Sequence, residues 1–114
     1  MASVLLVEDE ALIRMMIADM VVELGHNIAG EAGDLQTGVA LASAAEIDIA
    51  ILDVRLGADS SEAIAEALRS RNIPFVFASG YGAEGVPAKY KDRPILRKPF
   101  QIEELERCLL SLKR

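Results

Sequence analysis

Five polar residues that could act together in chemistry are spread along this chain of 114 residues. They are Glu8, Asp9, Asp53, Ser79 and Lys98. Each stands at the carboxyl end of a short apolar segment that is typical of a buried strand. Three carboxylates, a hydroxyl and an ammonium group can form a magnesium-dependent site for a phosphoryl group, because Mg²⁺ prefers oxygen ligands. Packing does not require these residue types at these positions, so we interpret them as functional.

The apolar segments alternate with helical patterns, which predicts how the five residues are brought together. Strands are expected at 3–7, 27–31, 48–53, 75–78 and 94–97. Helices are expected at 11–24, at 34–44 with Asp34 as N-cap, from Ser60 or Ser61 to 71, and at 101–113. Strands alternating with helices predict an α/β fold with a doubly wound parallel sheet and helices on both faces. In such a sheet the carboxyl ends of the strands form one edge, where ligands bind.

One segment fits the helical pattern poorly. Residues 80–93 include three glycines and Pro87, and each of these opposes a regular helix. We therefore expect a loop here, with a short or poorly formed helix.

Composition restricts the class of protein. The net charge of −6, without a basic stripe, argues against a nucleic-acid binder. No apolar run approaches the roughly 20 residues that span a membrane, so no membrane contact is expected. The single Cys108 cannot form an internal disulfide, which suits a cytoplasmic protein. We expect one domain covering residues 1–114.

The order of the polar residues resembles a known family. Glu8-Asp9, Asp53, Ser79 and the sequence Lys98-Pro99-Phe100 resemble the receiver domain of two-component response regulators, which is CheY-like, over the whole chain. The resemblance implies a flavodoxin-like five-stranded sheet of strand order 2-1-3-4-5. It also implies that Asp53 accepts a phosphoryl group from a histidine kinase or a histidine phosphotransfer protein. A cis peptide bond between Lys98 and Pro99 is implied as well.

The metal site is expected to use the acidic residues. Asp9 and Asp53 are expected to be direct Mg²⁺ ligands, and Glu8 is expected to act through water or as an outer acid. By resemblance, the carbonyl of Arg55 is the backbone ligand. Lys98 would neutralise phosphoryl oxygens, and Ser79 would donate a hydrogen bond to one of them.

The sequence also departs from the usual receiver pattern. Ile95 stands where receivers commonly carry an aromatic switch residue, and an aromatic residue is found instead at Tyr81. Residues 74–82 resemble the Phe-Ala-Thr-Gly-Tyr subgroup of single-domain receivers, with Ser79 in place of threonine. We therefore expect Ser79 and Tyr81 to form the switch. Gly57 stands where receivers often have proline.

Particular residues disfavour two other functions. A small phosphatase with Asp53 as nucleophile would usually carry a second acid two residues later, where Arg55 stands. A nucleotide-binding module is disfavoured because the first strand-to-helix turn, 7–10, is acidic and lacks glycine. The chain carries no DNA-binding or catalytic segment after its last helix, so we expect output through contact with an unidentified protein, or a role as a phosphate relay or sink.

Overall fold

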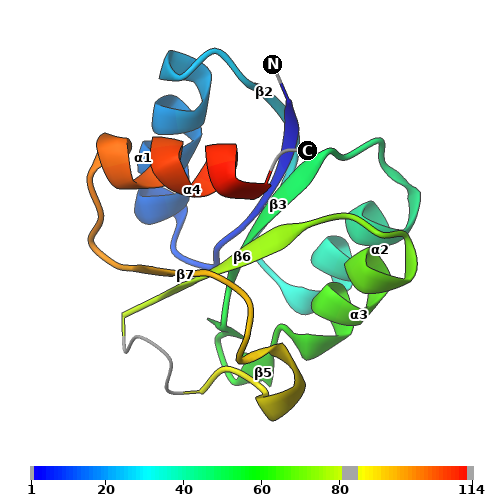
Figure 1. The fold of residues 1–114 in the computed structure, drawn as a ribbon. Helices are drawn as coiled ribbons and strands as arrows, with labels where there is room; N and C mark the ends of the chain where they lie inside the picture. Colours follow the sequence, from blue (N-terminus) through cyan, green and yellow to red (C-terminus); the bar gives the residue numbers. More distant parts are fainter. Residues whose placement is uncertain (1, 81–84, 113–114) are drawn as a thin grey trace.

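A parallel sheet of five strands forms the centre of the molecule (Figure 1). The computed structural model describes residues 2–80 and 85–112. The strands of this sheet are β1 Ser3–Val7, β2 Asn27–Ala32, β3 Ile49–Asp53, β6 Phe75–Ser79 and β7 Ile95–Arg97. Their order in space is β2-β1-β3-β6-β7, and each neighbouring pair is parallel. Counting only these five strands, this is the predicted order 2-1-3-4-5.

In the described part of the chain, four α-helices cover the two faces of the sheet (Figure 1). They are α1 Ala11–Glu23, α2 Leu35–Ala44, α3 Glu62–Ser70 and α4 Ile102–Leu112. Helices α2 and α3 pack on one apolar cluster, and α1 and α4 pack on the other. Successive side chains of a strand point to opposite faces, so in β1 Leu5 belongs to the first cluster and Leu6 to the second. None of the described helices is long and apolar enough to cross a membrane.

The ends of the helices follow local sequence signals. Asp34 caps α2 as predicted, because its Oδ1 accepts a hydrogen bond of 2.8 Å from the backbone N–H of Thr37. Helix α1 ends one residue before the predicted position, and Gly25 follows with a φ of +90°. At the start of α3, Ser60 provides the hydroxyl oxygen that accepts a hydrogen bond from the N–H of Glu62.

A short hairpin between β3 and α3 was not predicted. It consists of β4 Arg55–Leu56 and β5 Asp59–Ser60, paired antiparallel. Gly57 in the connecting turn has a φ of +63°. Ser61 fixes the base of the hairpin, since its N–H and its hydroxyl both donate to the carbonyl oxygen of Val54.

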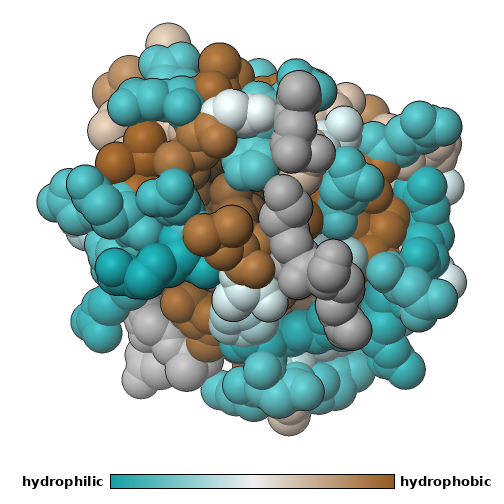
Figure 2. Space-filling view, turned by 45° about the horizontal axis from the view of Figure 1, so that its top comes forward, coloured by the Kyte–Doolittle hydropathy of each residue, from teal (hydrophilic) through white to brown (hydrophobic). Residues whose placement is uncertain are grey.

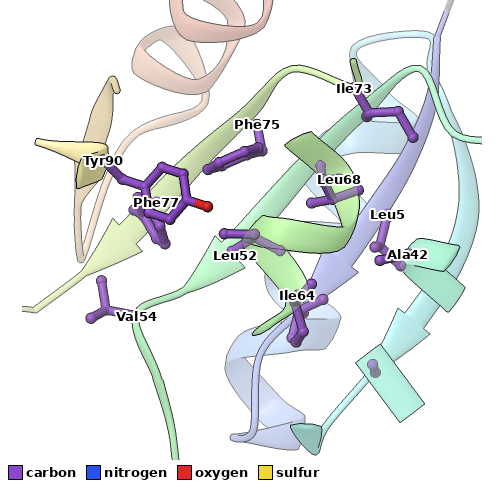
Figure 3. Packing of buried hydrophobic residues seen from close by; sticks show 14 of the residues in the cluster. Leu5, Ala42, Leu52, Val54, Ile64, Leu68, Ile73, Phe75, Phe77 and Tyr90 are labelled. Carbon is purple, nitrogen blue, oxygen red and sulfur yellow. The ribbon is translucent and has the colours of Figure 1, made fainter. Parts of the chain in front are cut away.

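The connection between β6 and β7 contains one turn of 3₁₀ helix, η1 Ala88–Tyr90, in its described part. This agrees with the expectation of a short helix between residues 80 and 93. Tyr90 is buried, and its ring makes an edge contact with Phe75 and a tilted contact with Phe77 (Figure 3). Lys89 forms ion pairs with Glu62 and Glu66 of α3. A buried aromatic ring and exposed ion pairs therefore hold this segment against the sheet and α3.

Candidate functional site

The acidic residues converge at the carboxyl edge of the sheet. Val7 pairs with Leu52 across β1 and β3, so Glu8 and Asp53 follow at the same level. One carboxylate oxygen each from Glu8, Asp9 and Asp53 lies within 4.8 Å of the others. Two adjacent parallel strands thus bring together three groups that lie up to 45 positions apart in the chain.

Lys98 joins this acidic cluster from the far end of the sequence. Its backbone N–H donates to the carbonyl oxygen of Ser79 at 2.8 Å, so the last residue of β6 is connected to the residue that follows β7. Its Nζ donates to Oε1 of Glu8 at 2.8 Å and lies 3.5 Å from Oδ2 of Asp53. The peptide bond between Lys98 and Pro99 is cis, as the resemblance implied. Ser79 itself is buried at the same edge.

Glu8 is the most enclosed acid of the site, with 1% of its surface exposed. Lys98 contacts Oε1, and the backbone N–H of Glu10 donates to Oε2 at 3.1 Å. Arg14 supports the same turn from α1, since its Nη1 donates to the backbone carbonyl of Glu8 at 2.7 Å. A buried carboxylate needs such partners, because removing its charge from water without compensation is costly. Sequence reasoning did not find the supporting role of Arg14, which no local motif indicates.

The environment of Asp53 disfavours its charged form. Burial, followed by the negative charge of Glu8, raises the pKa of Asp53 to about 7. Burial also works against the charge of Lys98, but the hydrogen bond to Glu8 and the charge of Asp53 outweigh it and raise the pKa of Lys98. The site therefore has an ammonium group held in place and a carboxylate that additional positive charge would ionise.

Asp9 is exposed and is held by the hairpin. Its Oδ2 accepts a hydrogen bond of 2.8 Å from the backbone N–H of Gly57. Partial burial acts to raise the pKa of Asp9, but hydrogen bonds, first that from Gly57, outweigh it and keep the pKa below its ordinary value. The sequence shows Gly57 only as a replacement for proline, and its N–H meets Asp9 only in the folded chain.

The structure leaves the predicted roles of two other site residues, Arg55 and Tyr81, untested. The side chain of Arg55 is directed to the hairpin, where Nη2 donates to the carbonyl oxygen of Ala58 at 3.1 Å. The role of the Arg55 carbonyl as a metal ligand stays a prediction. Tyr81 lies outside the described residues, so its role as a switch residue also stays a prediction.

The converging oxygens suit a hard divalent cation. Glu8, Asp9 and Asp53 are chemically appropriate ligands for Mg²⁺, which binds oxygen atoms and keeps several waters. A dication would also relieve the repulsion that raises the pKa of Asp53. The donor set therefore fits a magnesium site in which these three residues would hold the ion.

A groove of about 870 Å³ opens beside the cluster. Asp9, Asp53 and Lys98 line one part of it, whereas Met16 of α1 and Phe100 line an apolar part. On the face shown in Figure 2, hydrophobic side chains are interspersed with hydrophilic ones. A charged site thus borders an apolar surface on which another protein could rest.

The chain is thus a doubly wound α/β domain with an acidic cluster and a lysine at the carboxyl edge of its sheet. The chain belongs to the response regulator receiver domain family, whose model matches residues 4–109. It is therefore a receiver domain of two-component signal transduction.

Individual relatives agree with this assignment. The chain is 39% identical over 106 residues to the transcriptional regulatory protein PdtaR of Mycobacterium tuberculosis, covering 90% of this chain and 52% of that protein. It is 31% identical to the chemotaxis protein CheY of Thermotoga maritima, covering 97% of each. The solution structure of SdrG from Sphingomonas melonis Fr1 has a TM-score of 0.85 and 39% identity, covering 98% of this chain and 96% of that chain. The chain thus spans about half the length of PdtaR.

Proposed function

We propose that this receiver domain accepts a phosphoryl group on Asp53, in a magnesium-dependent reaction, from a histidine kinase or a histidine phosphotransfer protein. The observation that carries the proposal is the position of Lys98, whose ammonium group bridges Glu8 and Asp53 at the acidic cluster. This arrangement supplies a nucleophile, a place for a dication and a fixed positive charge. The assignment of the whole chain, residues 1–114, to one such domain is part of the proposal, as is a cytoplasmic location.

In the proposed reaction an oxygen of Asp53 attacks the phosphorus of a phosphohistidine. A new O–P bond forms while the P–N bond breaks, and the imidazole leaves with the electron pair and takes up a proton. Phosphoryl transfer depends mainly on positioning and on neutralising charge. Lys98 provides a positive charge on one side of Asp53, and Glu8 keeps that ammonium group in place.

The cation would supply the remaining positive charge at the phosphoryl oxygens. We propose that Asp9 and Asp53 bind it directly, with Glu8 as an outer acid and the Arg55 carbonyl as a backbone ligand. The raised pKa of Asp53, about 7, supports this assignment, because the nucleophile then depends on added positive charge to be ionised.

The proposed output is a change in contact with a partner protein, or onward transfer of the phosphoryl group as a relay or sink. Ser79 lies at the end of β6 next to Lys98, where its hydroxyl could donate to a phosphoryl oxygen. A solution structure of SdrG in its BeF₃-activated conformation has 39% identity to this chain and a TM-score of 0.80. We propose that Ser79 moves toward the phosphoryl group and that Tyr81 changes position with it.

A phosphatase that uses Asp53 as nucleophile is less well supported. Such an enzyme would need a general acid near Asp53, whereas the Arg55 side chain binds the carbonyl of Ala58. Steady turnover of a phosphomonoester would nevertheless favour this alternative.

Labelling with acetyl phosphate and Mg²⁺ tests the proposal. We expect one acid-stable, base-labile phosphoryl group on the parent chain and none on Asp53→Asn. Ser79→Ala should still be labelled, because Ser79 is assigned to the response and not to the bond that forms. Asp48→Asn is a matched control, since Asp48 lies just before the other end of β3. Label that persists on Asp53→Asn would overturn the proposal.

A further inference from the structure

The hydrogen bond between Gly57 and Asp9 connects two parts of the site that are 48 residues apart in the chain. The donor is a backbone N–H in the turn of the β4–β5 hairpin, and the acceptor is Oδ2 of a proposed metal ligand. A carboxylate oxygen of Asp9 is therefore fixed by main chain, which cannot change rotamer as a side chain can.

Only certain residues can make this contact from position 57. The φ of Gly57 is +63°, in the left-handed region that glycine adopts readily and most other residues avoid. No atom lies within 4 Å of a Cβ added there, so backbone conformation and not space is the restriction. A proline would remove the N–H and fix φ near −65°, so it could not make the bond.

The hairpin that carries Gly57 is anchored at several points. Leu56 is buried in the core. The side chain of Arg55 stabilises the turn by donating a hydrogen bond to the carbonyl oxygen of Ala58. At the base, Ser61 donates twice to the carbonyl of Val54. The N–H of Gly57 is thus held on a supported element, as a positioning group requires.

We propose that the backbone amide of Gly57 is a positioning group for the metal site, holding Asp9 so that its carboxylate is oriented for the cation before the cation binds. This inference rests on the proposed function, because it assumes that Asp9 is a metal ligand. A carboxylate has acceptor sites for both a hydrogen bond and a metal ion, so the N–H and the cation can share it. Hydrogen bonds to ligating groups orient them, and losing one typically weakens metal binding about 10–100-fold.

Calorimetric titration of the full metal-free chain with Mg²⁺ tests the inference. We expect Gly57→Pro to bind Mg²⁺ roughly 10–100-fold more weakly than the parent. Gly57→Asn should bind close to the parent, because asparagine keeps the N–H and tolerates the left-handed region. The Mg²⁺ affinity of Gly57→Ala should lie between those of the proline and asparagine variants, because alanine keeps the N–H donor but disfavours the left-handed turn. This variant replaces Gly57→Pro in the comparison if the proline variant does not fold.

A double-mutant cycle separates a positioning role from a general loss of structure. If Gly57 acts through Asp9, then Gly57→Ala should have little further effect on Mg²⁺ affinity in an Asp9→Asn chain. Equal Mg²⁺ affinity in the parent and Gly57→Pro would overturn the inference. Tighter binding by Gly57→Pro would also overturn it, because the amide would then compete with the cation. If the parent itself does not bind Mg²⁺, the proposed function fails first.

Discussion

Asp53 lies in an environment that opposes its own charge. Burial and the negative charge of Glu8 raise its pKa to about 7, although Lys98 lies 3.5 Å away. Such a group reduces the stability of the folded protein when it is ionised, and it gains from any positive charge brought to it. Strongly shifted carboxylates of this kind are concentrated at functional sites.

We predict that Asp53→Asn stabilises the metal-free protein at alkaline pH. Between the ordinary carboxyl pKa of 3.8 and about 7, the unfolded chain has released its proton while folded Asp53 retains it, so stability falls as pH rises through this window. The variant lacks this loss, so its melting temperature should exceed that of the parent by several degrees above about pH 7 and converge with it toward acidic pH. Thermal unfolding across pH, with Asp48→Asn as control, measures the difference. A constant difference at every pH would contradict the raised pKa.

The buried hydroxyl of Tyr90 lowers the stability of the folded protein. Its hydroxyl is buried and has no hydrogen-bond partner among the residues that the structure describes. Figure 3 shows this hydroxyl inside the cluster formed with Phe75, Phe77 and Leu52. An unsatisfied buried polar group costs about 1–3 kcal/mol.

We therefore predict that Tyr90→Phe raises the free energy of unfolding by about 1 kcal/mol or more, because it removes the hydroxyl and keeps the ring. Tyr90→Ala should instead lower it by about 3–5 kcal/mol through loss of the ring contacts. Chemical denaturation of the three proteins measures both effects. Should the phenylalanine variant prove less stable than the parent, the hydroxyl has a partner and the prediction is wrong.

Helix packing on the face of the sheet that α2 and α3 cover depends on a small residue. Gly38 lies inside α2, where glycine weakens a helix by about 1 kcal/mol relative to alanine. A Cβ at this position would overlap Cδ1 of Ile64 in α3, and it would lie 3.1 Å from Cγ1. Ile64 is fully buried and cannot move away easily. Close approach of α2 and α3 therefore outweighs helix propensity at this position.

We predict that Gly38→Ala destabilises the fold by about 1–3 kcal/mol, since overpacking exceeds the gain in helix propensity. In an Ile64→Val chain, which lacks the overlapping Cδ1, the same substitution should cost much less. Denaturant unfolding of the four proteins gives the coupling between the two positions. Additive effects would show that the two helices do not meet as described.

At the scale of the whole molecule, the apolar groove beside the site continues onto exposed residues of α1. Leu12, Met15 and Met16 are 68%, 56% and 53% exposed near the end of α1 that adjoins the acidic cluster. Exposed apolar residues grouped in this way commonly mark a surface for another protein. In the proposed reaction, a protein phosphodonor would bring its histidine to Asp53, and this surface is adjacent.

We predict that replacing both Met15 and Met16 with glutamine slows phosphotransfer from a protein donor by roughly tenfold, which corresponds to about 1.4 kcal/mol of lost contact. Labelling by acetyl phosphate should be unchanged, because that donor makes no contact with the helix. Val22→Gln is a matched control, being 58% exposed at the opposite end of α1. An equal loss with both donors would indicate damage to the site instead of a docking surface.

Much of the fold could be predicted because its signals are local. Strand positions followed from short apolar segments, and Asp34 caps α2 as its position indicated. The strand order came from the family resemblance, and the sheet confirms it. The poor helix pattern of residues 80–93 correctly indicated a short helix, because glycine and proline act on the backbone wherever they stand.

Only the tertiary structure shows which of the predicted site residues contact one another, and through which atoms. Lys98 contacts Glu8 across 90 positions, and Gly57 contacts Asp9 across 48. These bonds exist only after β1, β3 and β7 align at one edge, so no local pattern contains them. The amino-acid order sets the kinds of residue that reach the edge, because each stands at or just after the end of a strand. The assembled sheet determined their distances and the raised pKa of Asp53, because burial and charge act through space and not along the chain.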